Sequence, residues 1–285
     1  MSLTKSISQF IDNTLIDLGR QFRWSYLPPL MIYVAAGISG LTGIVGVFFI
    51  KDYLNLSAAF LAGLGFWAGI PWALKMPLGH LVDLIWQRKN YLVFVGAGLI
   101  VLSVIIMYGL IIHTETMASI LKVETWFIVS ALLAPVGYVT QDVVADAMTV
   151  EAVPSTDDQG NKYSTQQIKI MHTTMQTLGR FAIIGGFVLV ALVNVVMFTG
   201  VSALSEPEKI EIYGRIYLYA LIIPIVSVSG VFLAMYLKRQ RLEKLKKSGV
   251  SDEELKKLMT EFGVSTQPNW WILGGSLVFV IFTLG

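Results

Sequence analysis

The sequence predicts an all-α membrane protein, and three observations support this fold class. Apolar residues make up 55% of the 285 residues and charged residues only 14%, whereas a soluble domain carries about 25% charged residues. The mean hydropathy is +0.67. The apolar residues are grouped in runs of about 20, the length that a helix needs to cross a bilayer. These properties exclude a soluble enzyme domain and a disordered chain.

Six such runs and a shorter seventh divide the chain into four regions. We predict a cytoplasmic segment with an amphipathic helix over 1–29, a six-helix transmembrane bundle over 30–237, a basic cytoplasmic linker over 238–269 and the start of a truncated seventh helix over 270–285. The N-terminal helix is expected either to lie on the membrane surface or to be solvated. The six predicted spans are 30–50, 56–76, 91–112, 124–148, 170–199 and 213–237.

Basic residues are distributed unevenly between the loops on the two sides of the predicted bundle. If the N-terminus is cytoplasmic, fifteen of the 21 Lys and Arg residues fall on the inside and four on the outside. Such a bias sets the orientation of membrane proteins. We therefore predict a multi-pass protein of the plasma (inner) membrane with its N-terminus in the cytoplasm.

The residue types that many enzymes and metal sites require are scarce. Cys is absent, and the three His residues lack metal-ligand spacing. No Walker-type nucleotide loop, GxSxG or HExxH motif occurs in the sequence. We therefore expect no enzymatic activity, no cofactor and no bound metal. The expected surroundings are a lipid bilayer, with no nucleic-acid partner.

Charged and polar residues inside the predicted spans are the candidate functional residues, because charges in lipid are costly. Asp142 and Asp146 are four residues apart and should share one helix face. Gln141 precedes them, and the next span carries Gln176 and Arg180. Asp142 and Arg180 should lie at similar depth, so we predict that they face the interior and interact. Asp142, Arg180, Gln176 and Gln141 then form a substrate- or proton-coupling site, or alternatively a fixed ion pair that locks two helices.

A second group of residues occupies the predicted cytoplasmic ends of the spans. A charge network there could hold one access state closed and break in the other. The predicted gating residues are Gly79, Asp83, Arg88, Lys89, Asp146 and Glu151. Lys75, near the inner end of the second span, is expected to extend its ammonium group toward the interface.

We predict that residues 79–89 form the cytoplasmic loop between the second and third spans. The spacing of Gly79, Asp83, Arg88 and Lys89 resembles the signature that the major facilitator superfamily carries in this loop. Leu84 and Trp86 depart from that signature.

Three further stretches resemble the folate–biopterin transporter branch of that superfamily. They are 48–57, 71–79 and 141–147, of which the third is also similar to muropeptide and acetyl-coenzyme-A permeases.

The resemblance implies a secondary active transporter with twelve helices in two halves. This chain would supply the six-helix N-terminal half and the start of helix seven, and a C-terminal half in the same or a separate chain would complete it. The implied activity is proton-coupled, alternating-access uptake of a small organic anion such as a folate or pterin. The alternatives are a muropeptide-type permease and a non-transporting membrane assembly or receptor protein on the same scaffold.

Overall fold

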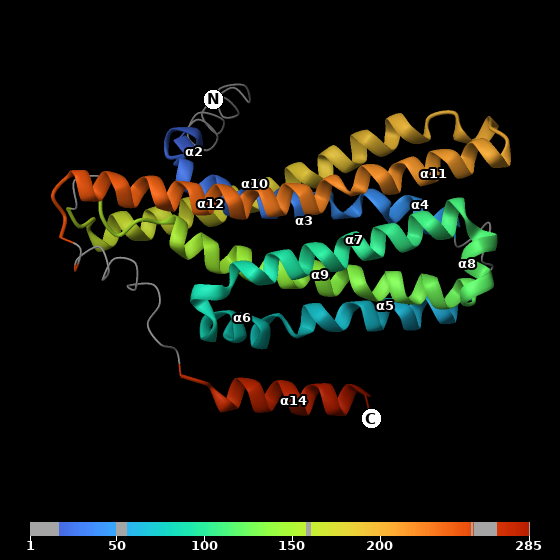
Figure 1. Ribbon diagram of the computed structural model, residues 1–285, viewed down its shortest axis with the longest axis horizontal. Helices are drawn as coiled ribbons and strands as arrows, with labels where there is room; N and C mark the ends of the chain where they lie inside the picture. Colours follow the sequence, from blue (N-terminus) through green and yellow to red (C-terminus); the bar gives the residue numbers. More distant parts are fainter. Residues whose placement is uncertain (1–16, 50–55, 158–160, 252, 254–266, 285) are drawn as a thin grey trace, which may run out of the picture.

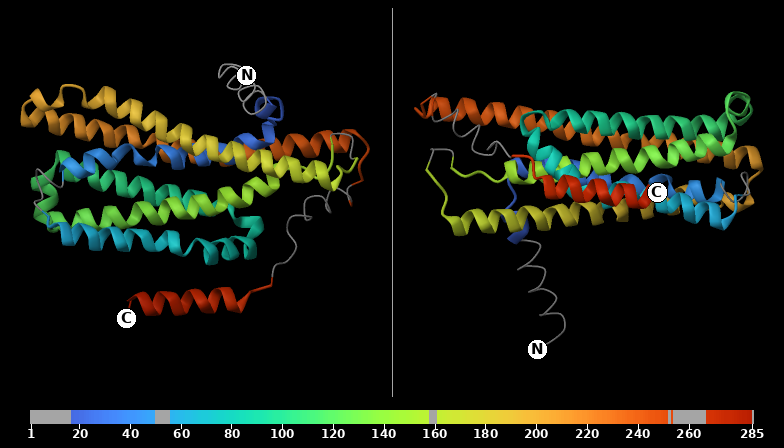
Figure 2. Two further views of the ribbon diagram at one scale, coloured as in Figure 1. Left: turned by 180° about the vertical axis from the view of Figure 1, so that it is seen from behind. Right: turned by 90° about the horizontal axis from the view of Figure 1, so that it is seen from below.

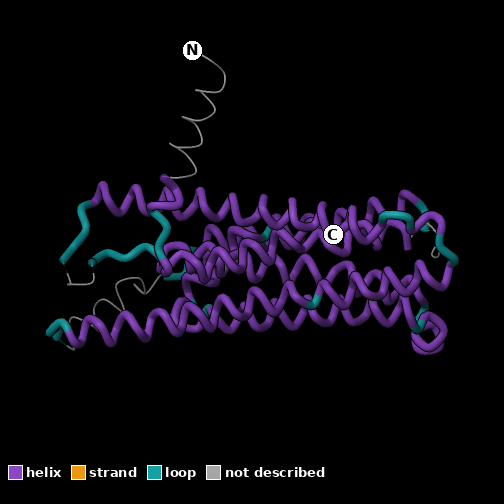
Figure 3. Tube along the Cα trace, turned by 90° about the horizontal axis from the view of Figure 1, so that it is seen from above, coloured by secondary structure: helices purple, strands orange, loops and turns teal. Residues whose placement is uncertain are grey.

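The computed structural model describes residues 17–49, 56–157, 161–251, 253 and 267–284. Within these residues every named element is a helix, and pairing of the β type is limited to an isolated bridge between Thr156 and Lys162. The helices lie side by side along one long direction (Figure 1, Figure 3). The predicted all-α fold is confirmed.

Six stretches of helix are long and apolar enough to cross a membrane, as predicted. They are Trp24–Gly46, Ala58–Leu84, Asn90–Ile112, Val123–Ala152, Thr165–Phe198 and Glu206–Lys247. The predicted seventh run forms a shorter apolar helix, α14 (Trp270–Leu284). The chain is therefore a multi-pass membrane protein.

Three of the six spans are interrupted. In the second, α5 contains Pro71, which has no N–H to donate to the helix. The helix breaks at Leu74, and α6 starts with Lys75. The pieces of the interrupted spans are η2 (Trp24–Tyr26), α3 (Leu27–Gly37), η3 (Ile38–Thr42) and α4 (Gly43–Phe49) in the first, α5 (Ala58–Ala73) and α6 (Lys75–Leu84) in the second, and α11 (Glu206–Ala220) and α12 (Ile222–Lys247) in the sixth.

The third, fourth and fifth spans are continuous helices. They are α7 (Asn90–Ile112), α9 (Val123–Ala152) and α10 (Thr165–Phe198). The short connecting elements are α2 (Asp17–Arg20), η5 (Trp86–Arg88), α8 (Thr114–Ile120) and η6 (Val201–Ala203).

Several helices extend beyond the predicted spans, and in α6 and α12 the extension replaces a segment that we predicted as loop or linker. We predicted a loop from Gly79, but α6 continues to Leu84, which makes the first part of this segment helical. We predicted a linker from Lys238, but α12 continues to Lys247 because this segment is rich in Leu, Lys, Arg and Glu, all good helix formers. The predicted amphipathic helix at the N-terminus lies almost entirely outside the described residues.

The helices approach most closely where glycines face each other. A Cβ added at Gly186 of α10 would lie 2.6 Å from the Cα of Gly37 in α3. A Cβ added at Gly137 of α9 would lie 2.7 Å from the carbonyl oxygen of Gly96 in α7. Such contacts let backbones pack directly, which is a main source of helix association in lipid. α3 lies in the middle of the bundle, against α9, α10 and α12 (Figure 2).

The buried side chains form two clusters along the bundle. One cluster contains Tyr33, Val82, Val143 and Met175 and joins α3, α6, α9 and α10. It lies toward the end where α6 meets α7 and where α12 terminates, which we call the basic end (Figure 1). The other cluster lies toward the opposite end, near α8. The first cluster positions the candidate site.

Candidate functional site

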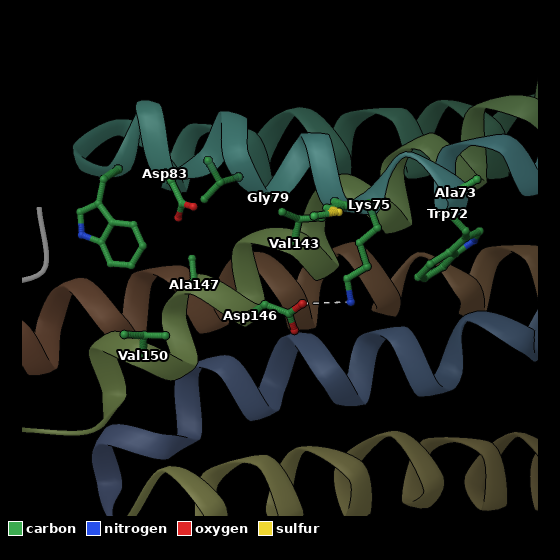
Figure 4. Close-up of a pocket in the computed structure, with 12 residues that line it drawn as sticks. Trp72, Ala73, Lys75, Gly79, Asp83, Val143, Asp146, Ala147 and Val150 are labelled. Atoms are coloured by element: carbon green, nitrogen blue, oxygen red, sulfur yellow. Dashed lines mark ion pairs between the residues drawn. The ribbon is translucent and has the colours of Figure 1, made fainter. Parts of the chain in front are cut away.

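An ion-pair cluster connects the second span to the fourth. The Lys75 Nζ lies 2.5 Å from Asp142 Oδ2 and 2.9 Å from Asp146 Oδ2. Figure 4 shows Lys75 extending from α6 toward α9, with the ion pair to Asp146 drawn as a dashed line. One ammonium group therefore binds two carboxylates, and the prediction that Asp142 and Asp146 share a helix face is confirmed.

Tyr33 of α3 adds a third helix to this cluster. Its hydroxyl donates a hydrogen bond of 2.6 Å to Asp146 Oδ1. Asp146 thus accepts from Tyr33 on one oxygen and from Lys75 on the other. We use "charge cluster" for Lys75, Asp142, Asp146 and Tyr33.

The two carboxylates of the charge cluster differ in their surroundings. The side chain of Asp142 is 8% exposed, and that of Asp146 is 48% exposed. Lys75 is intermediate at 39%. With all three groups ionised, the charge cluster carries one net negative charge, and its most deeply buried member is Asp142.

A hollow of about 630 Å³ opens beside the charge cluster, between α5 and α6 on one side and α9 on the other. Lys75 and Asp146 line it directly, together with a third charged residue, Asp83. Two tryptophans contribute aromatic surface. The lining residues are Trp72, Ala73, Lys75, Met76, Gly79, Val82, Asp83, Trp86, Val143, Asp146, Ala147 and Val150.

The Asp142 carboxylate does not pair with Arg180, so our prediction of that contact is wrong. Arg180 and Gln176 lie on exposed positions of α10. Neither has a hydrogen bond or ion pair to Asp142 among the described residues, whereas Lys75 supplies the compensating charge. Our expectation that Lys75 extends to the interface is wrong for the same reason: two carboxylates hold its ammonium group.

Gln141 is buried between three helices rather than facing the hollow. Its Nε2 donates to the carbonyl oxygen of Val93 in α7 at 3.0 Å and to the hydroxyl of Ser227 in α12 at 2.9 Å. Its neighbours therefore satisfy both N–H groups of the amide. This geometry gives Gln141 a role in joining α7, α9 and α12 next to the charge cluster.

A second ion pair lies at the basic end. The Lys89 Nζ is 2.8 Å from Glu151 Oε1 and 4.2 Å from the centre of the Trp86 ring. Lys238 of α12 approaches the same Glu151 oxygen at 4.0 Å. Burial lowers the pKa of Lys89 below its usual value, and the charge and hydrogen bond of Glu151 oppose that shift. The predicted gating residues Lys89 and Glu151 are thus brought together.

The other predicted gating residues are more dispersed. Gly79 and Asp83 line the hollow on α6, and Asp146 belongs to the charge cluster. Arg88 is exposed in η5. Within the described part of the chain, no group of three or more His, Asp or Glu side chains is arranged to hold a metal ion.

The sequence did not identify Lys75 and Tyr33 as site residues. A usable signal existed for Lys75, because a lysine inside a span needs a counter-ion and two aspartates lie in the inner part of a neighbouring span. No comparable signal marks Tyr33, since a tyrosine in an apolar helix is common at any depth.

The chain resembles a known transporter over part of its length. It is 30% identical over 138 residues to a protein of Synechocystis sp. (strain ATCC 27184 / PCC 6803 / Kazusa) described as a folate-biopterin transporter. The match covers 47% of this chain and 26% of that protein. No family model matches the chain, and no solved structure matches it.

Proposed function

We propose that the chain is the membrane-embedded part of a secondary active transporter. The transporter would take up a small organic anion, such as a folate or pterin, together with protons. The observation that carries the proposal is a buried carboxylate, Asp142, held by a lysine that lines an open hollow within the membrane spans. The partial likeness to a folate-biopterin transporter supports the same class of activity.

The depth of Asp142 supports a coupling role. Asp142 lies ten residues before the end of α9 at Ala152, which is about 15 Å along the helix. Ionised groups at such depth are rare in membrane proteins and usually serve ion or substrate pathways. A carboxylate beside an open hollow can take up a proton from one side and release it to the other as access alternates.

The proposed cycle requires a second half that moves against this one. Rocking of the two halves about the site would expose the hollow to each side in turn. A C-terminal six-helix half, in the same or a separate chain, is the proposed partner. We propose a major-facilitator arrangement in the plasma membrane with a cytoplasmic basic end. Exposed Trp24 and Trp270 fit a position of that end at a membrane interface, where tryptophans gather on either side of the bilayer.

In this proposal the named residues have separate tasks. Asp142 and Asp146 bind the coupling protons, and Gln141 fixes α9 against its neighbours. Lys89 and Glu151 form the contact that opens and closes the basic end. Arg180 and Gln176 remain candidate substrate contacts from the exposed face of α10, and Gly79, Asp83 and Arg88 remain candidate gating residues.

A non-transporting receptor or assembly protein is the competing proposal from a different class. Such a protein needs the ion pair only to lock helices, and it has no need for an open hollow beside that pair. The hollow lined by Lys75 and Asp146 therefore favours transport. A muropeptide-type permease would share the same mechanism and differ in the substrate.

Uptake into proteoliposomes tests the proposal. The full-length protein would be supplied with labelled folate, biopterin or a muropeptide, with and without an inwardly directed proton gradient. We expect gradient-dependent uptake of one of these compounds and its loss in Asp142→Asn. Glu115→Gln, an equivalent change in the exposed helix α8, is the control and should retain uptake.

Two results would argue against the proposal. If no candidate compound accumulates under the gradient, the receptor alternative gains support. If Asp142→Asn accumulates substrate as the wild type does, with the same dependence on the gradient, Asp142 has no coupling role.

A further inference from the structure

We infer that Lys75 is the binding residue for a carboxylate of the transported molecule, and that it is masked until Asp142 and Asp146 take up protons. The inference rests on the proposed function and deepens it, because it assigns the substrate contact and the order of binding. Protons would bind first and the anion second.

The geometry shows how Lys75 is masked. A lysine ammonium has three N–H donors, and Asp142 and Asp146 engage the Nζ at 2.5 and 2.9 Å. The side chain nevertheless remains 39% exposed and lines the hollow. A carboxylate that enters the hollow can therefore approach Lys75, where it competes with two carboxylates of the protein.

The composition of the hollow leaves Lys75 as the only cationic partner for an anion. Of the twelve residues that line it, Lys75 is the single basic residue, whereas Asp83 and Asp146 are acidic. Arg180 is not among the lining residues. An anion in this hollow therefore has Lys75 as its one opposite charge, and the other two charged lining residues repel it.

The charge of the cluster sets the order of events. Lys75 with two ionised aspartates has a net charge of −1, so an added carboxylate is repelled. One proton makes the cluster neutral, and a second leaves Lys75 with a free positive charge. Each proton also weakens a contact between a carboxylate and the Nζ, and thereby frees an N–H donor for the substrate.

The groups that govern this titration come from three helices. α6 contributes Lys75 and Asp83, α9 contributes Asp142 and Asp146, and α3 contributes the hydroxyl of Tyr33. α5 and α7, which also pack against α9, carry no charged residue. α10, which packs against α3 and α9, carries Lys169, His172 and Arg180, and none of these has a hydrogen bond or ion pair to the charge cluster among the described residues. α12 carries charged residues only beyond the apolar part of its span, from Lys238 onward.

Chemical labelling tests the masking without any ligand. The full-length protein in lipid nanodiscs would be treated with a water-soluble acetylating reagent, and acetylation of Lys75 would be measured by mass spectrometry. We expect slow modification in the wild type and modification faster by about tenfold in Asp142→Asn/Asp146→Asn, within the usual range of coupling between two sites. Lys122, exposed between α8 and α9, is the internal control and should react equally in both proteins.

Binding measurements test the anion contact. Folate serves as the anionic probe, and pterin, which has the ring without the carboxylates, serves as the uncharged probe. In the wild type, folate affinity should rise by about tenfold from pH 7 to pH 5.5, again the usual size of such coupling. Pterin affinity should change little over this range, in which its ring stays uncharged.

Variants separate the masking by Asp142 and Asp146 from the anion contact made by Lys75. The double variant Asp142→Asn/Asp146→Asn should bind folate tightly at both pH values, and Lys75→Gln should lose the preference for folate over pterin. Lys75→Arg should retain it, because arginine keeps the positive charge. The matched control, Glu115→Gln/Glu124→Gln, removes two exposed carboxylates near the opposite end and should behave as the wild type.

The inference is overturned if Lys75 of the wild type reacts as fast as that of the double variant. It is also overturned if Lys75→Gln binds folate with unchanged affinity and pH dependence. In that second case, proton-driven uptake by the wild type would leave the proposed function intact. Conversely, the double variant could expose Lys75 to acetylation while the wild type takes up no compound. That result would contradict the proposed function and leave the masking of Lys75 intact.

Discussion

Asp142 of α9 is the one buried carboxylate among the described residues, and Lys75 of α6 neutralises it at 2.5 Å. The two residues belong to different spans, so the ion pair joins the second span to the fourth. Breaking such a pair from one side leaves a charge with no partner, which destabilises more than removal of both charges.

This relationship predicts a non-additive effect on stability. Lys75→Met should lower the free energy of unfolding by about 1–3 kcal/mol, less than for a fully buried pair because Lys75 is partly exposed. The double variant Lys75→Met/Asp142→Asn should recover a large part of this loss. Thermal unfolding in detergent would measure both, with Lys122→Met as the control. A double variant less stable than either single variant would contradict the prediction.

The contact between α3 and α10 predicts a steric effect at one of two adjacent glycines. A Cβ at Gly186 would lie 2.6 Å from the Cα of Gly37, while a Cβ at Gly185 would meet nothing within 4 Å. Gly186→Ala should therefore destabilise the protein by about 1–3 kcal/mol, the usual effect of overpacking. Gly185→Ala is the matched control and should unfold at the wild-type temperature. Equal unfolding temperatures for the two variants would show that α3 and α10 do not pack at Gly186.

The number of spans could be predicted from the sequence because length and hydropathy determine it. The shared face of Asp142 and Asp146 followed from helix geometry, since residues four apart lie one above the other. The interruptions within spans were harder to predict. η3 interrupts the first span between Gly37 and Gly43 with no proline at that point. The glycines there weaken the helix, but their low helix propensity does not determine where it changes.

The partner of Asp142 could not be predicted because sequence position gives the depth of a residue and not the direction in which its helix faces. We predicted Arg180 from its depth, whereas Lys75, near the inner end of its span, was expected to extend toward the interface. The close contact of Gly186 with α3 holds α10 in one rotation, and Arg180 then lies on an exposed position. Small residues alone did not reveal that rotation either, since neighbouring Gly185 faces open space.

The two hydrogen bonds of Gln141 predict graded losses of stability. Ser227→Ala removes one partner of the amide, whereas Gln141→Leu removes both bonds and leaves the Val93 carbonyl without this donor. We expect Gln141→Leu to destabilise by about 1–3 kcal/mol and Ser227→Ala by less. Thermal unfolding measures both, and Thr140→Val, one residue away on α9, is the control. If Gln141→Leu unfolds as the wild type but loses substrate binding, Gln141 is a binding residue, as the sequence first suggested.

The ion pair at the basic end predicts a pH-dependent effect on stability. Burial lowers the pKa of Lys89, and Glu151 opposes this shift, so Glu151→Gln should lower that pKa further. A lysine whose pKa is lower in the folded than in the unfolded state binds fewer protons when folded. The free energy of unfolding therefore rises with pH between the folded-state pKa and the unfolded-state pKa. Glu151→Gln should be less stable than the wild type near neutral pH, by about 1–3 kcal/mol.

The stability deficit of Glu151→Gln should narrow as the pH is raised from 7 toward 9.5. Lys89 loses its proton over this range and then no longer carries a buried charge without a partner. Unfolding temperatures of both proteins across this range provide the measurement, and their difference cancels the titration of lysines and tyrosines that lie away from Glu151, which Lys238 does not. The double variant Lys89→Met/Glu151→Gln has no ammonium group at position 89, so its difference from the Lys89→Met variant measures the contribution of the more exposed Lys238 and should vary much less with pH. A deficit in Glu151→Gln that stays constant or widens with pH would show that Lys89 does not rely on Glu151 for its charge.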